Sequence, residues 1–296
     1  MQEPMFKRYG IKGSDFWREL DEIYHKYQSA NLRVNRETLY LNHILTCVRQ
    51  GIFEGLNNDL LFEFGGQLEF YNGIPELFEE IEMVLMDPRF RKYGISVEHY
   101  VVSTGLAQII RGSKIAGYVK EIWGCEYIET PIKSQLIIKE YPGEEPDSLK
   151  LISQIGYSID NTTKTRAIYE INKGVKIHPE IDINSSIAKE NRRIPFENMI
   201  YIADGPSDVP AFSIVKHYGG RTYAVYPRGN RAAFKQVDQL RKDDRIDAYG
   251  EADYSEGTTT NLWIIEQTCQ IAEQICRKKE YAIKRSASPP PIHLND

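Results

Sequence analysis

The stretch "YIADGPSDVPAF", residues 201–212, passes from an apolar run into a turn that carries two carboxylates. Residues 198–204 are predicted to form a buried strand and residues 207–220 a helix. Asp204 then ends the strand, and Asp208 lies about one turn into the helix. Ligands of open α/β sheets bind at the carboxyl ends of strands, and carboxylate oxygens suit Mg²⁺, so the stretch predicts a magnesium loop. A turn acid followed by an acid at a helix N-terminus explains the same pair equally well.

Helices and strands alternate on both sides of this loop. The apolar spacing predicts further strands at 99–105 and 221–227, a short strand within 245–254, and helices at 72–86, 106–117, 162–174, 232–240 and 258–279. Such alternation is typical of a mostly parallel sheet between two helical layers. The predicted fold class is therefore α/β.

The two ends of the chain differ from this pattern. Residues 14–64 are predicted to be helical throughout, with Ser14 and Asn35 as N-caps, which makes an all-α module. The C-terminal stretch "RSASPPPIHLND" is proline-rich and is expected to be disordered.

The composition limits the classes of partner that the protein can bind and indicates its cellular compartment. Of the 296 residues, 41% are hydrophobic and 27% are charged, and a net charge of −5 argues against a nucleic-acid partner. No apolar run approaches the ~20 residues that span a bilayer, and "MQEPMFKRYG" has no signal-peptide core. The four cysteines, at 47, 125, 269 and 276, form no CxxC pair and indicate reduced thiols. We therefore expect a cytoplasmic protein without a nucleic-acid or membrane partner.

A second candidate site lies in "YVVSTGL", residues 100–106, where a predicted strand ends and a helix begins. The Ser103 hydroxyl, together with the backbone N–H groups of Thr104 and Gly105, can hold a phosphate oxygen there. Taken alone, capping of the helix by Ser103 is the commoner explanation of this pattern.

Lys164 lies in "NTTKTRAIYEIN", at the start of a predicted helix. A cation in the first turn is mildly unfavourable in the field of the helix dipole, so this placement indicates an anionic ligand. Taken alone, a solvated surface lysine is the commoner explanation. Lys173, Lys176 and Lys189 lie nearby as rival phosphate ligands.

In chain order these features resemble the haloacid dehalogenase-like (HAD) phosphohydrolase superfamily, above all its phosphoserine-phosphatase-like members with a small helical cap. "YVVSTGL" is similar to the second motif of that family, Lys164 to the third-motif lysine, and "IADGPSDVPAF" to the fourth motif, usually Gly-Asp-Gly-x-x-Asp. Ala203 stands in place of the first glycine, which slightly crowds the turn. The segment "FYNGIPELFEEI" also resembles the return from cap to core. The resemblance covers about residues 1–270, and the fourth motif is its most specific part.

The resemblance implies a fold and a division of the chain. The fold would be a Rossmann-like, three-layer, mostly parallel sheet with an all-α cap near the N-terminus. Residues 1–9 would lead into the cap, residues 10–70 would form the helical cap, residues 71–282 the α/β core, and residues 283–296 a disordered proline-rich tail.

The resemblance also implies roles for the candidate residues. Mg²⁺ would be held by first-motif aspartates and Asp204, with Asp208 orienting the inner shell. The groups that bind and neutralise the transferring phosphoryl group would be Ser103, Thr104, Gly105 and Lys164. The substrate would be a small phosphorylated metabolite, and Glu3 falls near a substrate-recognition acid of phosphoserine phosphatases.

The first motif of the family, Asp-x-Asp-x-Thr, is missing from this sequence. Its first aspartate attacks phosphate to form an aspartyl-phosphate, and its second is the general acid/base. The chain contains no Asp-x-Asp, and Glu180-Ile181-Asp182 lies in the wrong place, between the third and fourth motifs. The start of the chain resembles the segment just downstream of the first motif. We therefore expect that the first core strand, which the family places between the strands of Ser103 and Asp204, has been lost by N-terminal truncation.

Three functions remain open at this point. The first is a magnesium-dependent phosphomonoester hydrolase whose nucleophile strand is absent from this chain. The second is a catalytically inactive HAD-fold protein that binds a phosphorylated ligand. The third, an α/β nucleotide-binding protein of another kind, is the weakest, because the chain has neither G-x-G-x-x-G nor a P-loop. No feature of the sequence identifies the substrate or the oligomeric state.

Overall fold

A computed structural model describes residues 1–129, 150–178 and 180–286. The chain divides into two compact units, of which the first is Met1–Phe70 with His99–Ile168, and the second is Tyr71–Glu98 with Tyr169–Asp296. Each unit combines helices with a three-stranded sheet that contains parallel strands, so the predicted α/β class is confirmed. The predicted division into a cap and a core stays a prediction.

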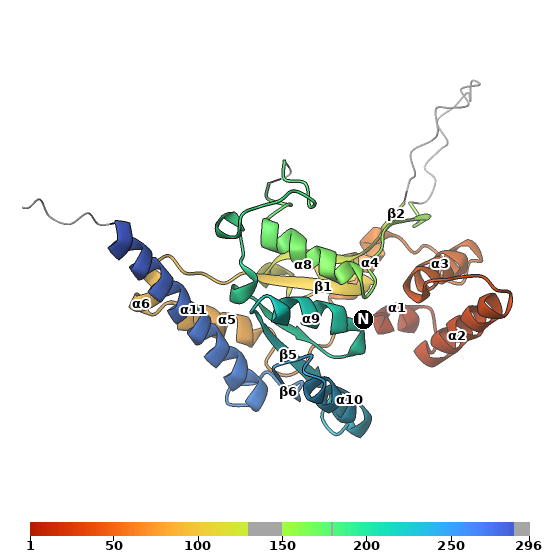
Figure 1. The fold of residues 1–296 in the computed structure, drawn as a ribbon. Coiled ribbons are helices and arrows are strands. Elements are labelled where there is room, and N and C mark those ends of the chain that lie inside the picture. The colour runs from red at the N-terminus through yellow and green to blue at the C-terminus, as the bar shows by residue number, and fades with distance from the viewer. Residues whose placement is uncertain (130–149, 179, 287–296) are drawn as a thin grey trace, which may run out of the picture. The chain divides into compact units, whose positions relative to one another are not determined.

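The N-terminal part of the first unit is helical (Figure 1). Its helices are α1 (Glu3–Arg8), α2 (Gly13–Ser29), α3 (Arg36–Arg49) and α4 (Asn58–Gly65). The Asn35 side chain caps α3 as predicted, because its oxygen accepts a hydrogen bond of 2.8 Å from the N–H of Thr38. The prediction for Ser14 is wrong, since α2 begins one residue earlier, at Gly13.

The sheet of the first unit has the strand order β1-β2-β3. β1 (His99–Leu106) is parallel to β2 (Val119–Ile128), and β2 is antiparallel to β3 (Gln154–Tyr157). The connection from β1 to β2 contains α7 (Ala107–Arg111) and the 3-10 turn η1 (Ala116–Tyr118). β2 was not predicted from the sequence, because charged residues interrupt its apolar run, although the stretch between them is buried.

The sheet of the second unit is entirely parallel and carries the loop that contains Asp204. Its strands, in order, are β4 (Ile200–Ala203), β5 (Arg221–Tyr226) and β6 (Ala248–Glu251). On one face, Ala224 of β5 packs with Phe212 of α9 (Val209–His217) and Val237 of α10 (Arg231–Lys242). On the other face, Tyr223 and Val225 of β5 pack toward Trp263 of α11 (Thr259–Ser286). Helices therefore cover both faces of this sheet.

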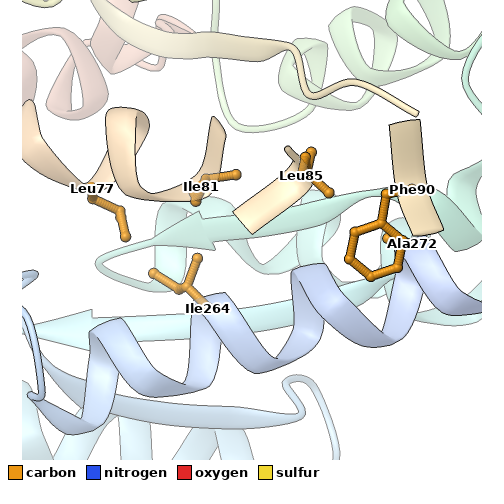
Figure 2. Packing of buried hydrophobic residues seen from close by; sticks show 6 residues of the cluster. All are labelled: Leu77, Ile81, Leu85, Phe90, Ile264 and Ala272. Atoms are coloured by element: carbon orange, nitrogen blue, oxygen red, sulfur yellow. The ribbon is translucent and has the colours of Figure 1, made fainter. Parts of the chain in front are cut away.

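The helical layer around α11 also contains α5 (Glu76–Leu85) and α6 (Pro88–Arg91). Figure 2 shows the buried apolar side chains of this layer, which are Leu77, Ile81, Leu85, Phe90, Ile264 and Ala272. Ile202 of β4 packs against the same cluster. The strand that precedes Asp204 is thus anchored on this layer.

The remaining helical elements lie between β3 and β4 and between β4 and α9. α8 (Thr163–Lys173) is followed by the 3-10 turns η2 (Lys189–Asn191) and η3 (Phe196–Asn198), and η4 (Pro206–Asp208) leads into α9. α11 continues to Ser286, so residues 283–286 of the predicted tail are helical, since no proline precedes Pro289 there. The rest of the predicted disordered tail lies outside the described residues. Over the residues that the structure describes, no helix is long and apolar enough to cross a membrane.

Candidate functional site

The loop after β4 presents the two predicted metal ligands differently. Asp204 directly follows the last residue of β4, and its side chain is exposed. Asp208 is the N-cap residue of α9 and is only 3% exposed. Within the described part of the chain, no hydrogen bond or ion pair engages the Asp204 carboxylate. Asp204 is therefore open to a ligand, whereas Asp208 is built into the fold.

Two hydroxyl groups hold the Asp208 carboxylate. The Tyr201 hydroxyl donates to Oδ1 at 2.5 Å, and the Ser207 hydroxyl donates to Oδ2 at 2.9 Å. Asp208 is an acid at a helix N-terminus, as the alternative explanation has it, but its side chain makes no capping hydrogen bond to α9. Burial, followed by the charges of Asp208 and Asp204, raises the pKa of Tyr201. The Tyr201 hydroxyl therefore stays protonated and donates a hydrogen bond to Asp208.

A segment after β6 lies beside Asp204. Burial, followed by the nearby Tyr71 and Asp204, raises the pKa of Tyr254. The Tyr254 N–H donates to the carbonyl oxygen of Asn72 at 2.8 Å, so the "YNG" segment before α5 packs on the end of β6. From the sequence, that segment was interpreted only as a return into the core, and Tyr254 was not among the predicted site residues.

The donor groups of this loop fit a hydrated magnesium ion. Mg²⁺ keeps several waters and is commonly held by one or two carboxylates together with substrate phosphates. Asp204 offers exposed oxygens of this kind, while the oxygens of Asp208 already accept two hydroxyl hydrogens. Among the described residues, no group of three or more His, Cys, Asp or Glu side chains could hold a metal ion. The arrangement fits Asp204 as the ligand and Asp208 as its support.

Ser103, Thr104 and Gly105 lie at the carboxyl end of β1. The Ser103 hydroxyl oxygen accepts a hydrogen bond of 3.0 Å from the N–H of Gly105, and the N-cap of α7 is Leu106. Ser103 therefore does not cap a helix, and its hydroxyl hydrogen can be donated to an anion. The helix predicted over 106–117 is confined to the five residues of α7, so it adds little dipole to phosphate binding.

Met1 packs directly on this turn. A Cβ atom added to Gly105 would lie 2.2 Å from the sulfur of Met1. Glycine at position 105 is therefore what allows the N-terminal side chain to approach the Ser103 turn.

Lys164 is the second residue of α8 and is only 6% exposed. The explanation as a solvated surface lysine is therefore wrong. The rival Lys173 donates to the backbone carbonyl groups of Ile183 and Ser185, and Lys176 and Lys189 are exposed. Lys164 has an interaction within the chain, as a buried ammonium group requires, and its role in phosphate binding stays a prediction.

Asp160 sets the start of α8. Its carboxylate accepts hydrogen bonds from the N–H groups of Thr162 at 2.9 Å and Thr163 at 2.7 Å. Partial burial acts in the opposite direction, but these hydrogen bonds lower the pKa of Asp160. The sequence analysis missed Asp160, although an Asp before a Thr-rich helix start is a capping signal that could have identified it.

Cys125 links the Ser103 turn to the segment that leads into α8. Its thiol, in β2, donates to the carbonyl oxygen of Thr104 at 3.3 Å and accepts the N–H of Ile159 at 3.3 Å. Cys125 is 1% exposed, and burial raises the pKa of its thiol, which stays neutral. No sequence signal indicated this contact, because β2 was not predicted.

Glu3, the predicted substrate-recognition acid, lies at the start of the chain's first helix. It begins α1 and is exposed. It lines an open pocket of about 510 Å³ together with Lys7, Ile11, Lys12, Gly13, Ser14 and Trp17. The pocket is charged, but Ser103 is not among its lining residues.

The candidate residues thus form two groups. Ser103, Thr104, Gly105, Lys164 and Glu3 belong to the first unit, and Asp204 and Asp208 belong to the second. Within the first unit, Cys125 connects the Ser103 turn with the approach to Lys164. Within the second, Tyr201 and Ser207 hold Asp208 next to the exposed Asp204.

No family model matches the chain, and no solved structure matches it. An uncharacterized protein of Borreliella burgdorferi is 37% identical to it over 273 residues, which cover 91% of each chain. The chain belongs to the same family as this Borreliella burgdorferi protein.

Proposed function

We propose that this chain acts as a magnesium-dependent phosphomonoester hydrolase with a HAD-like, Rossmann-like fold. The loop after β4 carries the proposal, because it places an exposed Asp204 at the carboxyl end of a parallel strand beside a buried, doubly hydrogen-bonded Asp208. That edge of a parallel sheet is where α/β proteins bind their ligands. The proposed substrate is a small phosphorylated metabolite.

The proposed mechanism divides the work between carboxylates and phosphate-binding groups. Asp204 would hold Mg²⁺ with Asp208 as its support, and the ion would neutralise charge on the phosphoryl oxygens. The Ser103 hydroxyl would donate a hydrogen bond to a phosphoryl oxygen. The Lys164 ammonium would stabilise the charge of the same group, which is the main protein contribution to phosphoryl transfer.

The attacking carboxylate of the proposed hydrolase would lie outside these 296 residues, because they contain no Asp-x-Asp. Among the described residues β4 is an edge strand of its sheet, yet it is apolar on both faces, since Ile202 packs on one helical layer and Tyr201 and Ala203 pack on the other. Edge strands commonly carry charges or proline, whereas strands inside parallel sheets are apolar on both faces. This composition supports the expectation that a further strand pairs with β4.

A catalytically inactive protein that binds a phosphorylated ligand is the second candidate. The absence of Asp-x-Asp favours it, because binding needs only the loop, the Ser103 turn and Lys164. Calorimetric titration with a phosphorylated ligand and Mg²⁺, in the absence of any turnover, would support this candidate.

Hydrolysis of p-nitrophenyl phosphate with Mg²⁺ tests the first proposal. We would compare this chain with a chain extended upstream to the preceding in-frame start codon, each as wild type and as Asp204→Asn. Asp243→Asn, at an exposed position after α10, is the matched control. Activity that is lost in Asp204→Asn and retained in Asp243→Asn supports the hydrolase. No activity in either chain contradicts it.

A further inference from the structure

We propose that Tyr201 is a positioning residue of the metal loop, whose hydroxyl fixes the Asp208 carboxylate and thereby sets Asp204 for Mg²⁺. This inference rests on the proposed function, because it assigns a role within the same site. Tyr201 would touch neither the metal nor the substrate.

The position of the Tyr201 ring is determined by the fold. Tyr201 lies in the middle of β4, where it is in register with Thr222 of β5. Its ring meets the ring of Phe212 in α9 edge to face, with centroids 5.3 Å apart. Packing of the strand and the ring therefore fixes the position of the hydroxyl, which donates to Asp208 at the start of α9.

The Asp208 carboxylate joins the loop to the sheet. Between β4 and α9, the N–H of Asp208 donates to the carbonyl oxygen of Gly205 at 3.0 Å, which is a bond within the loop. Gly205 is buried, although a Cβ atom added to it would meet nothing within 4 Å. The hydrogen bond from the Tyr201 hydroxyl to the Asp208 carboxylate thus connects the loop to β4.

Both oxygens of Asp208 are engaged, and this fixes the rotation of its carboxyl group. Tyr201 holds Oδ1 from the strand, and Ser207 holds Oδ2 from the loop. Asp208 supports the proposed ligand Asp204, and outer-shell groups that orient metal ligands commonly change metal affinity by roughly 10–100-fold when they are removed.

Binding of Mn²⁺ measured by electron paramagnetic resonance separates this role from a merely structural one. Mn²⁺ is the probe because it shares the preference of Mg²⁺ for carboxylate and water oxygens. Tyr201→Phe keeps the ring and removes the hydroxyl, and we expect its dissociation constant for Mn²⁺ to rise by roughly 10–100-fold. The matched control is Tyr223→Phe, which removes a buried tyrosine hydroxyl from the neighbouring strand, where it bonds Thr260 at 3.2 Å. The control should bind Mn²⁺ within about twofold of wild type.

Ser207→Ala provides a second test if Tyr201→Phe does not fold, because Ser207 lies in the loop and not in a strand. Its dissociation constant for Mn²⁺ should also rise. Wild-type affinity in folded Tyr201→Phe, or in Ser207→Ala where the first variant is unfolded, overturns the inference.

The variant Asp204→Asn distinguishes failure of the inference on Tyr201 from failure of the proposed function. If Asp204→Asn abolishes Mn²⁺ binding and Tyr201→Phe binds normally, only the role of Tyr201 is wrong. If wild type binds no Mn²⁺, the role of Tyr201 and the magnesium site of this chain are both wrong, and the p-nitrophenyl phosphate assay of the extended chain tests the hydrolase separately.

Discussion

At the residue scale, the two aspartates of the loop after β4 differ in burial and in hydrogen bonding. The Asp208 carboxylate is buried and accepts hydrogen bonds from Tyr201 and Ser207, whereas the Asp204 carboxylate is exposed. A buried carboxylate that loses hydrogen bonds leaves its partners unsatisfied, while an exposed one remains hydrated after substitution. The free energy of unfolding should therefore depend on Asp208, whereas ligand binding should depend on Asp204.

We expect Asp208→Asn to lower the free energy of unfolding by about 1.5–3 kcal/mol, because charge-assisted hydrogen bonds are lost in a buried site. Asp204→Asn should change it by less than about 0.5 kcal/mol. Urea unfolding of both variants without Mg²⁺ measures the difference. Equal free energies for the two variants would show that the contacts of Asp208 contribute no stability.

Cys125 gives a second prediction at this scale. Cys125→Ala leaves the buried N–H of Ile159 without its acceptor and should lower the free energy of unfolding by about 1–3 kcal/mol. Cys276→Ala, at a partly exposed thiol of α11, is the control. Chemical denaturation of the two variants is the measurement, and equal losses would speak against the bridging role of Cys125.

At the scale of elements, the start of α8 depends on a carboxylate. The pKa of Asp160 in the folded protein lies below its ordinary value of 3.8, because backbone N–H groups of α8 favour the charged form. A group with a lowered folded pKa contributes stability that is present above the unfolded pKa. That stability is lost as the pH falls through the folded pKa.

Asp160→Ala should therefore destabilise the protein by about 1 kcal/mol at pH 7, the usual effect of losing a capping side chain. The difference between wild type and variant should shrink below about pH 3.8. Denaturation curves recorded between pH 2 and pH 7 test this, with pH values chosen to bracket that range. A difference that stays constant over the whole range would argue against a role for the charged carboxylate.

Two glycines of the second unit should respond differently to alanine. Gly73 has a φ of 80°, and a Cβ there would lie 2.1 Å from the backbone of Tyr254, whereas a Cβ on Gly205 would meet nothing within 4 Å. Gly73→Ala should lower the free energy of unfolding by about 2 kcal/mol or more, through left-handed strain and the clash. Gly205→Ala should change it by less than about 0.5 kcal/mol. Thermal and urea unfolding compare them, and a stable Gly73→Ala would mean that the contact with Tyr254 is not required.

At the scale of the whole molecule, metal binding should be visible as a gain in stability. A ligand that binds only the folded state stabilises it by about 2.7 kcal/mol at a concentration of 100 Kd. We expect Mg²⁺ to raise the Tm of wild type and of Asp243→Asn, but not of Asp204→Asn. Differential scanning fluorimetry over a Mg²⁺ titration measures this. An unchanged Tm in wild type would contradict the magnesium site.

The strands with clear apolar runs were predicted well. The predicted strands at 99–105, 198–204, 221–227 and 245–254 correspond to β1, β4, β5 and β6. β2 was missed because Lys120, Glu121 and Glu126 obscure its pattern, and β3 is a short strand defined by its pairing with β2. A strand whose apolar pattern is interrupted is recognisable only once its neighbours bury it.

For the site, the sequence by itself determined that Asp204 lies at the end of a strand, that Ser103 lies near the end of a strand that a helix follows, and that Lys164 begins a helix. These are local properties, fixed by apolar periodicity and turn chemistry over a few residues. Only the tertiary structure decided that Tyr201 and Ser207 hold Asp208, that Lys164 is buried, and that Cys125 bridges two segments. The physical reason is that burial and hydrogen-bond partners depend on which elements pack together, and packing joins residues that lie far apart in the sequence.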